Sequence, residues 1–516
     1  MLLLGAGLVG LSAHSMVTHQ VYQEAIVAPT GPSPLNALLA SSNPIAETVG
    51  ALSQPGLLKA GNQGTAVLGL ASSWHVLDGG AKYSFTLPRG GRWSNGEPIT
   101  TRDVGFTLAV LQSAAFPDPA LAAPWRGISL YATSFWAGTF VLPEPAPNFS
   151  LTAEVPIVPE APYHDRPQLY LRSDQRPTAR FPPCSGPFFV AANTPDQISL
   201  VRNPYFRPAP LLAGFDLDLE PSPSAVGALL SKGAVDGWLA ATPQDLAALP
   251  KGVVRQRITS YSFVELLMNE AAGPLSDPIV RRALAAAIDR RQLVAAGVAG
   301  MGVPQYGPLP QSIPWARLGR AAVGTGPSAT SLLATDGYLR PPPLGVFEKG
   351  GRRLSLTISV PGLDPLPQAA EALAKMLDSQ GFAVTVVEGK ASSFMSTVLA
   401  SESFQLALVG FDNGPDPDLV PFWGSGLSSS QSLNFSQAPP DPILNHELDQ
   451  LATATTTAAK ATAYREVAQR LAQDMPAVFL YTPVDVYAHL SSVHVPGIPR
   501  DGDPLQRFGD VGLWTT

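Results

Sequence analysis

Residues 354–411 contain three short apolar runs separated by two segments with helical spacing, and this alternation is the strongest constraint on the fold. The runs are LSLTISV, AVTVVEG and FQLALVGF, and the segments between them are QAAEALAKMLDSQG and SSFMSTVLAS. Strands that alternate with helices form a mostly parallel sheet with helices on its faces. Gly381 follows the first segment, where a helix often ends in a left-handed residue. The stretch therefore predicts an α/β fold.

Three further segments carry clear local signals. Residues 82–87 alternate polar and apolar side chains, which predicts a strand. Thr100 and the threonine after it are candidate caps for a helix that we expect to begin at the next residue. The clearest helix is predicted over 276–296, with Ser276 as its N-cap. Residues 464–482 predict a helix followed by a buried strand.

Length and composition set the class of protein. The chain has 516 residues, which corresponds to about three domains. Hydrophobic residues make up 45% of it, which is too many for a disordered chain. The formal net charge is −7, and the sequence has no stripe of Lys and Arg interleaved with aromatic residues. These features argue against a nucleic-acid partner.

The amino-terminal segment 1–13, MLLLGAGLVGLSA, is apolar and contains a G-x-G-x-x-G pattern at Gly5, Gly7 and Gly10. A dinucleotide site would need a full strand before the glycines and a packed helix after them. The four residues before Gly5 are too few for such a strand. We therefore interpret residues 1–20 as a signal peptide or a membrane anchor that is short for a full span.

Four longer segments carry motifs in a fixed order. They are YSFTLPRGGRWSNGEPITTRDVGFTL (83–108), SGPFFVAANTPDQISLVRNPYF (185–206), LLMNEAAGPLSDPIVRRALAAAIDRRQLV (266–294) and FQLALVGFDNGPDPD (404–418). In order and spacing they resemble the family-5 extracellular solute-binding proteins of ABC importers, the cluster C type that binds oligopeptides, dipeptides or nickel. Most matched residues are expected to be structural, with Arg281 and Asp289 in a network on a helix face.

The resemblance implies an α/β, two-lobed periplasmic-binding-protein type II fold with mixed sheets and an extra α/β region inserted in the first lobe. Its hinge strands would lie near 258–266 and 480–485. The expected division of the chain is residues 21–52, 170–262 and 484–516 for lobe I, residues 53–169 for the extra region, and residues 263–483 for lobe II.

The resemblance also implies a function. The protein would capture a peptide-like small solute in an interlobe cleft by hinge closure and deliver it to the permease subunits of an ABC importer. It would act as a monomer in the periplasm or at the outer face of the cytoplasmic membrane. Two alternatives stay open: a non-transport sensory or structural module of the same fold, or binding of sugars or chelated metal instead of peptide. Since charged residues make up 14% of the chain, we expect a cleft that is apolar and polar-neutral rather than strongly ionic.

Candidate ligand-binding residues follow from the family motif in the loop 410–418. In peptide-binding members, an acid in this loop pairs with the free amine of the ligand, which otherwise binds through its backbone. Here the loop reads GFDNGPDPD and is one residue short. The family acid therefore falls on Asn413, with Asp412 as the neighbour that could supply the charge and Phe411 beside it. The alternative role for Asp412 is to cap the following turn. By position, further candidates are Trp423, Trp238, Asn36, Pro34, Phe263 and Glu265.

An enzymatic function has no motif to support it in this sequence. The G-x-S-x-G elbow of hydrolases and the H-E-x-x-H zinc motif are both absent, and the seven histidines are scattered. Cys184 is the single cysteine, so neither a disulfide within the chain nor a cysteine metal cluster can form. We expect no catalytic residues, no metal site and no cofactor.

Overall fold

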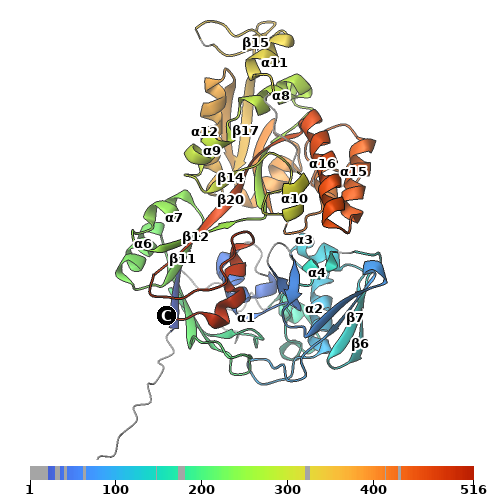
Figure 1. The fold of residues 1–516 in the computed structure, drawn as a ribbon, viewed down its shortest axis with the longest axis vertical. Helices are drawn as coiled ribbons and strands as arrows, with labels where there is room; N and C mark the ends of the chain where they lie inside the picture. The colour runs from blue at the N-terminus through green and yellow to red at the C-terminus, as the bar shows by residue number, and fades with distance from the viewer. Residues whose placement is uncertain are drawn as a thin grey trace, which may run out of the picture.

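The computed structural model describes residues 21–28, 35–39, 43–61, 65–146, 148–172, 181–319, 326–343, 345–412, 414–427 and 432–516. They form two bodies, one above the other in Figure 1. The lower body, which contains α1 (Pro44–Ser53), is called the first lobe, and the upper body, which contains α12 (Leu366–Ser379), the second lobe. The expected signal peptide or anchor at residues 1–20 lies outside the described residues.

One long strand, β20 (Ala477–His489), connects the lobes. Its carboxyl-terminal half pairs with β11 (Gly237–Ala240) and β12 (Val254–Thr259) on the first-lobe side. Its amino-terminal half pairs with β13 (Ser262–Met268) and β14 (Gly302–Pro304) on the second-lobe side. The two lobes therefore share a single path of hydrogen-bonded strands, and β20 crosses between them (Figure 1).

The second lobe confirms the predicted strand–helix alternation. Strand β17 (Ser355–Pro361) pairs parallel with β18 (Ala383–Gly389) on one side and with β19 (Leu406–Asp412) on the other. Helix α12 follows β17 and buries its apolar face against it. Gly381 adopts a positive φ of 100° just beyond the end of this helix, as expected of a residue that ends a helix.

The first lobe contains a mixed sheet around β1 (Val21–Val27). This strand pairs parallel with β10 (Gly214–Glu220) and with β11, while β9 (Gln197–Arg202) and β8 (Phe188–Asn193) continue the sheet antiparallel. Aromatic and aliphatic side chains from these strands form one core with the carboxyl-terminal 3-10 segment η9 (Pro504–Leu513). The start and the end of the described chain therefore pack together.

The chain between β1 and β8, which we call the inserted region, forms a separate antiparallel sheet. Its strand order is β4 (Ser73–Leu77), β5 (Lys82–Thr86), β7 (Ala137–Val141) and β6 (Ser129–Ser134). Strand β5 confirms the predicted alternation, because Tyr83 and Phe85 are buried in one aromatic core.

Helix α2 (Thr101–Leu111) covers this core and begins as predicted. Thr100 caps it, and the Asp103 carboxylate accepts a hydrogen bond from the Thr100 backbone N–H at 2.8 Å. This reciprocal arrangement is a capping box, which satisfies two backbone donors at the start of a helix.

The single helix predicted over 276–296 is wrong, because the chain forms two helices, α8 (Pro278–Ala287) and α9 (Arg290–Gly297). Asp277, not the serine before it, caps α8, since its carboxylate accepts from the Ile279 N–H at 2.8 Å. Asp289 caps α9 in the same way, and an N-cap requires a non-helical backbone. The helix is therefore interrupted just before Arg290.

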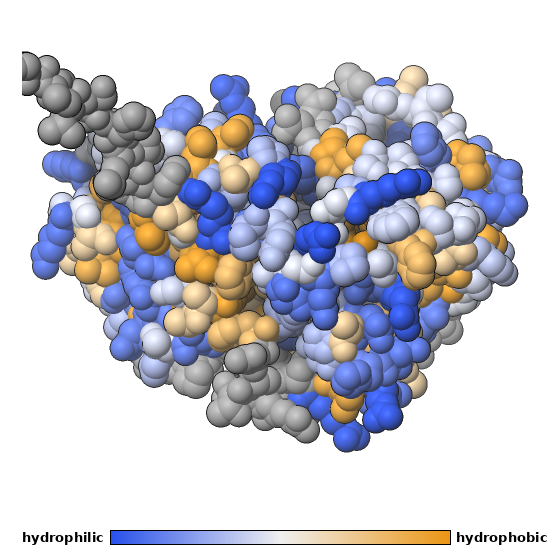
Figure 2. All heavy atoms as spheres, turned by 90° about the horizontal axis from the view of Figure 1, so that it is seen from below, coloured by the Kyte–Doolittle hydropathy of each residue, from blue (hydrophilic) through white to orange (hydrophobic). Residues whose placement is uncertain are grey.

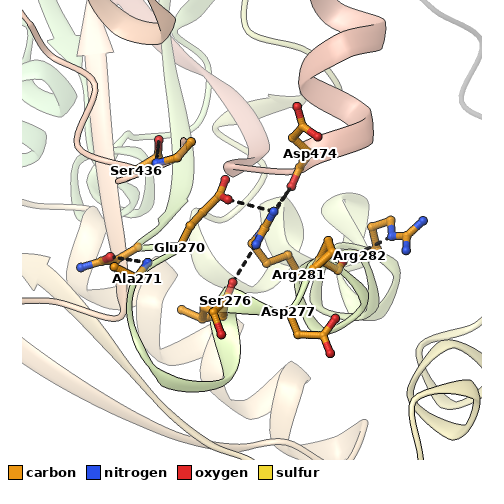
Figure 3. A network of polar contacts seen from close by, with 12 residues as sticks. Glu270, Ala271, Ser276, Asp277, Arg281, Arg282, Ser436 and Asp474 are labelled. Atoms are coloured by element: carbon orange, nitrogen blue, oxygen red, sulfur yellow. Dashed lines mark hydrogen bonds and ion pairs between the residues drawn. The ribbon is translucent and has the colours of Figure 1, made fainter. Parts of the chain in front are cut away.

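Arg281 lies in a buried polar network, as expected, but Asp289 does not share it. The guanidinium of Arg281 forms an ion pair with Glu270 at 3.0 Å. It also donates to the Asp474 carbonyl at 2.7 and 3.0 Å and to the Leu275 carbonyl at 2.8 Å (Figure 3). This network ties α8 to the end of α16 (Thr457–Asp474) and is structural.

The remaining elements complete the two lobes. In the face seen in Figure 2, apolar side chains lie in several separate groups among hydrophilic ones. Within the described residues, no helix is both long and apolar enough to cross a membrane. The other helices include α3 (Pro119–Ala122), α4 (Phe149–Thr152), α5 (Pro167–Leu171), α6 (Pro223–Lys232), α7 (Pro243–Ala248), α10 (Pro314–Gly319), α11 (Ala329–Thr335), α13 (Ala391–Phe394), α14 (Val420–Trp423) and α15 (Pro442–Thr453), and the short strands are β2 (Leu58–Ala60), β3 (Ala66–Leu68), β15 (Glu348–Lys349) and β16 (Arg352–Arg353).

Candidate functional site

A cavity of about 830 Å³ lies where the two lobes meet. The first lobe contributes residues of α1 and η9, the inserted region contributes the segment 151–156, and the second lobe contributes Asp412 at the end of β19. Because groups from both lobes line it, the cavity changes shape whenever the lobes move relative to one another. We refer to it as the interlobe cavity.

The connecting strands form part of the wall of the interlobe cavity. Ser260 and Ser262 flank the junction of β12 and β13, while Pro483 and Asp485 belong to β20. The Ser260 hydroxyl donates to the Ser262 hydroxyl at 2.8 Å and accepts from the Ser262 N–H at 2.8 Å. The Ser312 hydroxyl donates to the Ser260 carbonyl at 2.9 Å. The polar groups of the junction are therefore held in place beside the cavity.

Asp412, which the loop motif marks as a candidate ligand-binding residue, lines the cavity. Its side chain is exposed, and its Oδ1 accepts a hydrogen bond from the Gly414 N–H at 2.9 Å. This is the turn-capping contact considered as the alternative role, and it leaves the carboxylate exposed to the cavity. Asp412 also lines a second cavity of about 270 Å³, together with Phe411 and Tyr481.

Three aromatic candidates lie in apolar cores and do not line either cavity. Phe263 and Trp423 belong to one core of the second lobe, in which Trp423 packs on Phe479 with ring centroids 5.8 Å apart. Trp238 lies in a core of the first lobe beside α6. Phe263 and Trp238 lie on strands and Trp423 ends the short helix α14, and all three side chains are buried.

Glu265 is also interior. It lies on β13 between β19 and β20 and is 2% exposed, and its Oε2 has no hydrogen-bond partner among the described residues. Burial raises the pKa of this carboxyl to about 8. Glu265 is therefore protonated at neutral pH, because the neutral acid is the form that an apolar interior favours.

The remaining predicted site residues lie around the start of the first lobe or outside the described chain. Asn36 is buried, and its side-chain oxygen accepts from the Tyr170 hydroxyl and from the Leu38 N–H. It connects η1 (Ala37–Leu39) to the inserted region. Pro34 and Asn413 lie outside the described residues.

The cavity contains more ionisable side chains than the composition of the chain suggests. Five carboxylates line the interlobe cavity, and they are Glu47, Glu154, Asp412, Asp485 and Asp503. These acids come from segments that are far apart in the sequence, from Glu47 to Asp503. A composition averaged over the whole chain conceals such a cluster, because folding alone brings its members together.

The pKa values of three of these acids are raised. Burial, and then the charge of Asp503, raises the pKa of the Glu154 carboxyl to about 7. Burial raises the pKa of Asp485 to about 7, with Asp503 and Asp245 adding to the rise and Arg507 opposing it. The pKa of Asp503 is raised by burial and by the charge of Asp412. Like charges close together resist ionisation in this way.

A buried ion pair positions the carboxyl-terminal side of the cavity. The guanidinium of Arg507 donates to Glu24 Oε1 at 2.7 Å, and the Tyr487 hydroxyl donates to Glu24 Oε2 at 2.8 Å. Both charged side chains are almost completely buried. Because Arg507 belongs to η9, this pair fixes η9, and with it Asp503, against β1 and β20. Sequence reasoning did not identify this pair, whose members are 483 positions apart.

Metal binding is not indicated by the side chains of the structure. Among the residues that it describes, no group of three or more His, Cys, Asp or Glu is arranged to hold a metal ion. The lining residues of the cavity offer carboxylates, backbone groups and apolar walls to a ligand.

Comparison with known sequences supplies a family. The model of bacterial extracellular solute-binding proteins, family 5 (middle), matches residues 65–432. Protein XP55 of Streptomyces lividans is 28% identical over 444 residues, which cover 84% of this chain and 78% of that protein.

Comparison with solved structures confirms the two-lobed type II periplasmic-binding fold. The oligopeptide-binding protein AppA from Bacillus subtilis, in complex with a nonapeptide, matches with a TM-score of 0.73 and 20% identity, covering 96% of this chain and 98% of that one. NikZ from Campylobacter jejuni, in complex with Ni(L-His), matches with a TM-score of 0.72 and 17% identity, covering 97% and 100%.

Proposed function

Because the chain belongs to the bacterial extracellular solute-binding proteins of family 5, we propose that it captures a peptide-like small solute in the interlobe cavity and delivers it to the permease of an ABC importer. The observation that carries this proposal is the cavity itself, which residues of both lobes line. Its volume of about 830 Å³ lies within the usual range of small-molecule sites, roughly 300–1,000 Å³.

Hinge closure is the mechanism that this geometry supports. The lobes are joined through β20 and the junction of β12 and β13, which are few strands compared with the size of either lobe. Domains joined in this way close around ligands by changes at a few backbone positions. A ligand that touches Asp412 on one side and η9 on the other favours the closed arrangement, because closure alone completes both sets of contacts.

The complexes of two relatives support the nature of the solute. AppA from Bacillus subtilis holds a nonapeptide, and NikZ from Campylobacter jejuni holds Ni(L-His). We favour peptide for this chain because Asp412 is exposed at the cavity, and its carboxylate would pair with the amino terminus of a peptide. We further propose that the protein acts outside the cytoplasm, as a monomer without catalytic activity, and that its lobes follow the boundaries expected from the resemblance.

A thermal-shift experiment tests this function. Mixed dipeptides to decapeptides, sugars and chelated nickel are added to the purified protein, since a ligand stabilises the state that binds it, by about 2.7 kcal/mol at a hundredfold excess over its dissociation constant. Ala241→Trp fills the cavity, which Ala241 lines, and should abolish the shift. Ala132→Trp, on the exposed strand β6, is the matched control and should keep it.

The outcomes separate the alternatives. A shift with peptides that Ala241→Trp abolishes and Ala132→Trp preserves supports the proposal. A shift with sugar or chelated nickel alone changes the cargo and keeps the family function. If no solute shifts the melting temperature of the wild-type protein, the proposed function is contradicted.

A further inference from the structure

The charged side chains of the interlobe cavity are distributed over both lobes. Asp412 approaches from the second lobe, while Glu154, Asp485 and Asp503 approach from the inserted region, β20 and the start of η9. A ligand held between the lobes therefore meets carboxylates on two sides.

The cation at the cavity opposes the raised pKa values of Asp485 and Asp503 but is already paired with another acid. Among the described residues that line the cavity, Arg507 is the only one with a positive charge. Its guanidinium is already engaged by Glu24 at 2.7 Å and by the Pro504 carbonyl at 2.8 Å. Glu24 is fully buried and carries the opposite charge, so the pair is close to neutral. The raised pKa values of Glu154, Asp485 and Asp503 mean that a cation bound among these acids favours their ionised form.

Two residues that line the cavity each have one buried polar atom without a hydrogen-bond partner among the described residues. Glu154 Oε1 is completely shielded from solvent and has no hydrogen-bond partner among the described residues. Arg507 is 2% exposed, and its Nε likewise has no acceptor among them. A buried polar group left without a partner costs about 1–3 kcal/mol. Because both atoms are shielded from solvent, a ligand with a cationic donor for Glu154 and a carbonyl oxygen for Arg507 would remove both costs only after the side chains or the lobes move.

The geometry points to a ligand with two positive charges: we propose that the cavity selects peptides with a free amino terminus and a lysine or arginine side chain close to it. This inference rests on the proposed function. One cation meets Asp412, and the second meets the acids Glu154, Asp485 and Asp503 on the opposite side. A ligand with one charge leaves one of the two sides without a counter-charge when the lobes close, and like charges facing each other across a closed cavity oppose closure.

Titration calorimetry with four tripeptides tests the inference on the wild-type protein. The probes are Lys-Ala-Ala, norleucine-Ala-Ala, acetyl-Lys-Ala-Ala and Glu-Ala-Ala, which differ mainly in charge. We expect Lys-Ala-Ala to bind at least about tenfold more tightly than either norleucine-Ala-Ala or acetyl-Lys-Ala-Ala, which corresponds to about 1.4 kcal/mol. Glu-Ala-Ala should bind most weakly.

Substitutions in the cavity test whether its acids cause the preference for Lys-Ala-Ala. The double substitution Asp485→Asn with Asp503→Asn keeps side-chain shape and removes two charges, so it should reduce the advantage of Lys-Ala-Ala over norleucine-Ala-Ala to less than about threefold. Asp449→Asn, on the exposed face of α15, is the matched control and should leave the ratio unchanged.

Different results would overturn the preference for two positive charges and the proposed peptide-binding function. Equal affinity for Lys-Ala-Ala and norleucine-Ala-Ala overturns the preference for two charges and keeps the peptide-binding function. Tighter binding of Glu-Ala-Ala overturns it as well. If none of the four tripeptides binds, while longer peptides also fail to shift the melting temperature, both the inference and the proposed function are overturned.

Discussion

Asp503, at the start of η9 in the first lobe, and Asp412, at the end of β19 in the second lobe, line the same cavity from opposite sides. Burial raises the pKa of the Asp503 carboxyl, and the charge of Asp412 raises it further. The two acids are therefore electrostatically linked across the junction of the lobes, although no contact between them is needed.

This linkage predicts how neighbouring acids respond when Asp503 loses its charge. In Asp503→Asn, the pKa values of Glu154 and Asp485 should both fall, because the charge of Asp503 contributes to the rise of each. Carbon-13 NMR titration of the side-chain carboxyls measures both values. Asp449→Asn should leave them unchanged, and equal pKa values in Asp503→Asn and the wild-type protein would contradict the arrangement of the cavity.

The buried acid Glu265 predicts a dependence of stability on pH. Its pKa is raised by burial to about 8 in the folded protein, against about 4.3 in an unfolded chain. Between these values the folded state retains a proton that the unfolded state releases, so the free energy of unfolding decreases as pH rises, by at most about 1.4 kcal/mol per pH unit for one group. Glu154 and Asp485 add contributions of the same sign.

Substitution isolates the contribution of Glu265. Glu265→Gln keeps the shape and cannot ionise, so the loss of stability between pH 5 and pH 8 should be smaller than in the wild-type protein. Urea unfolding at both pH values measures the difference. Glu371→Gln, on the exposed face of α12, should behave like the wild-type protein, and an identical loss in Glu265→Gln would disprove the assignment.

Sequence patterns predicted correctly those helices and strands whose formation depends on residues close in the sequence. The alternation around Tyr83 and the cap at Thr100 were sufficient for β5 and α2. The break between α8 and α9 escaped prediction because the apolar spacing continues through it, while Asp289 satisfies the first N–H groups of a new helix. Side-chain capping thus overrode the periodicity.

The candidate site could be predicted only where a motif marks it. Asp412 ends strand β19 at the start of a recognisable loop, and it lines the cavity. Asp485 and Asp503 have no local signal, since they reach the cavity because β20 crosses between the lobes and η9 returns to the first lobe. Phe263 and Glu265 lie on a hinge-side strand as expected, but the strands on both sides of β13 enclose them.

The buried network around Arg281 predicts a large loss of stability on its removal. Arg281→Met leaves Glu270 without its ion-pair partner and the Asp474 carbonyl without two donors. Breaking a buried pair on one side typically costs about 3–5 kcal/mol. Arg282→Met removes a neighbouring exposed guanidinium that donates to the Pro278 carbonyl at 3.3 Å, and should change stability by less than about 0.5 kcal/mol. Urea unfolding compares the two variants, and equal losses would refute a structural role specific to Arg281.

Gly237 on β11 lies so close to two tyrosine hydroxyls that a larger side chain there is expected to move η9, which forms part of the cavity wall. A Cβ at this position would lie 2.3 Å from the Tyr22 hydroxyl and 2.6 Å from the Tyr487 hydroxyl. These hydroxyls are hydrogen-bonded to each other at 2.8 Å, and Tyr487 also donates to Glu24, the partner of Arg507. Gly237→Ala must therefore displace the chain of contacts that holds η9.

Overpacking of this kind costs about 1–3 kcal/mol, so Gly237→Ala should lower the free energy of unfolding by that amount and weaken peptide binding, because Asp503 moves with η9. Gly90→Ala is the matched control, since a Cβ there meets open space. Urea unfolding measures the first effect and titration calorimetry the second. If Gly237→Ala lowers stability but leaves peptide affinity unchanged, η9 keeps its position without the tyrosine contacts. The Glu24–Arg507 pair would then not be one of the interactions that position the cavity.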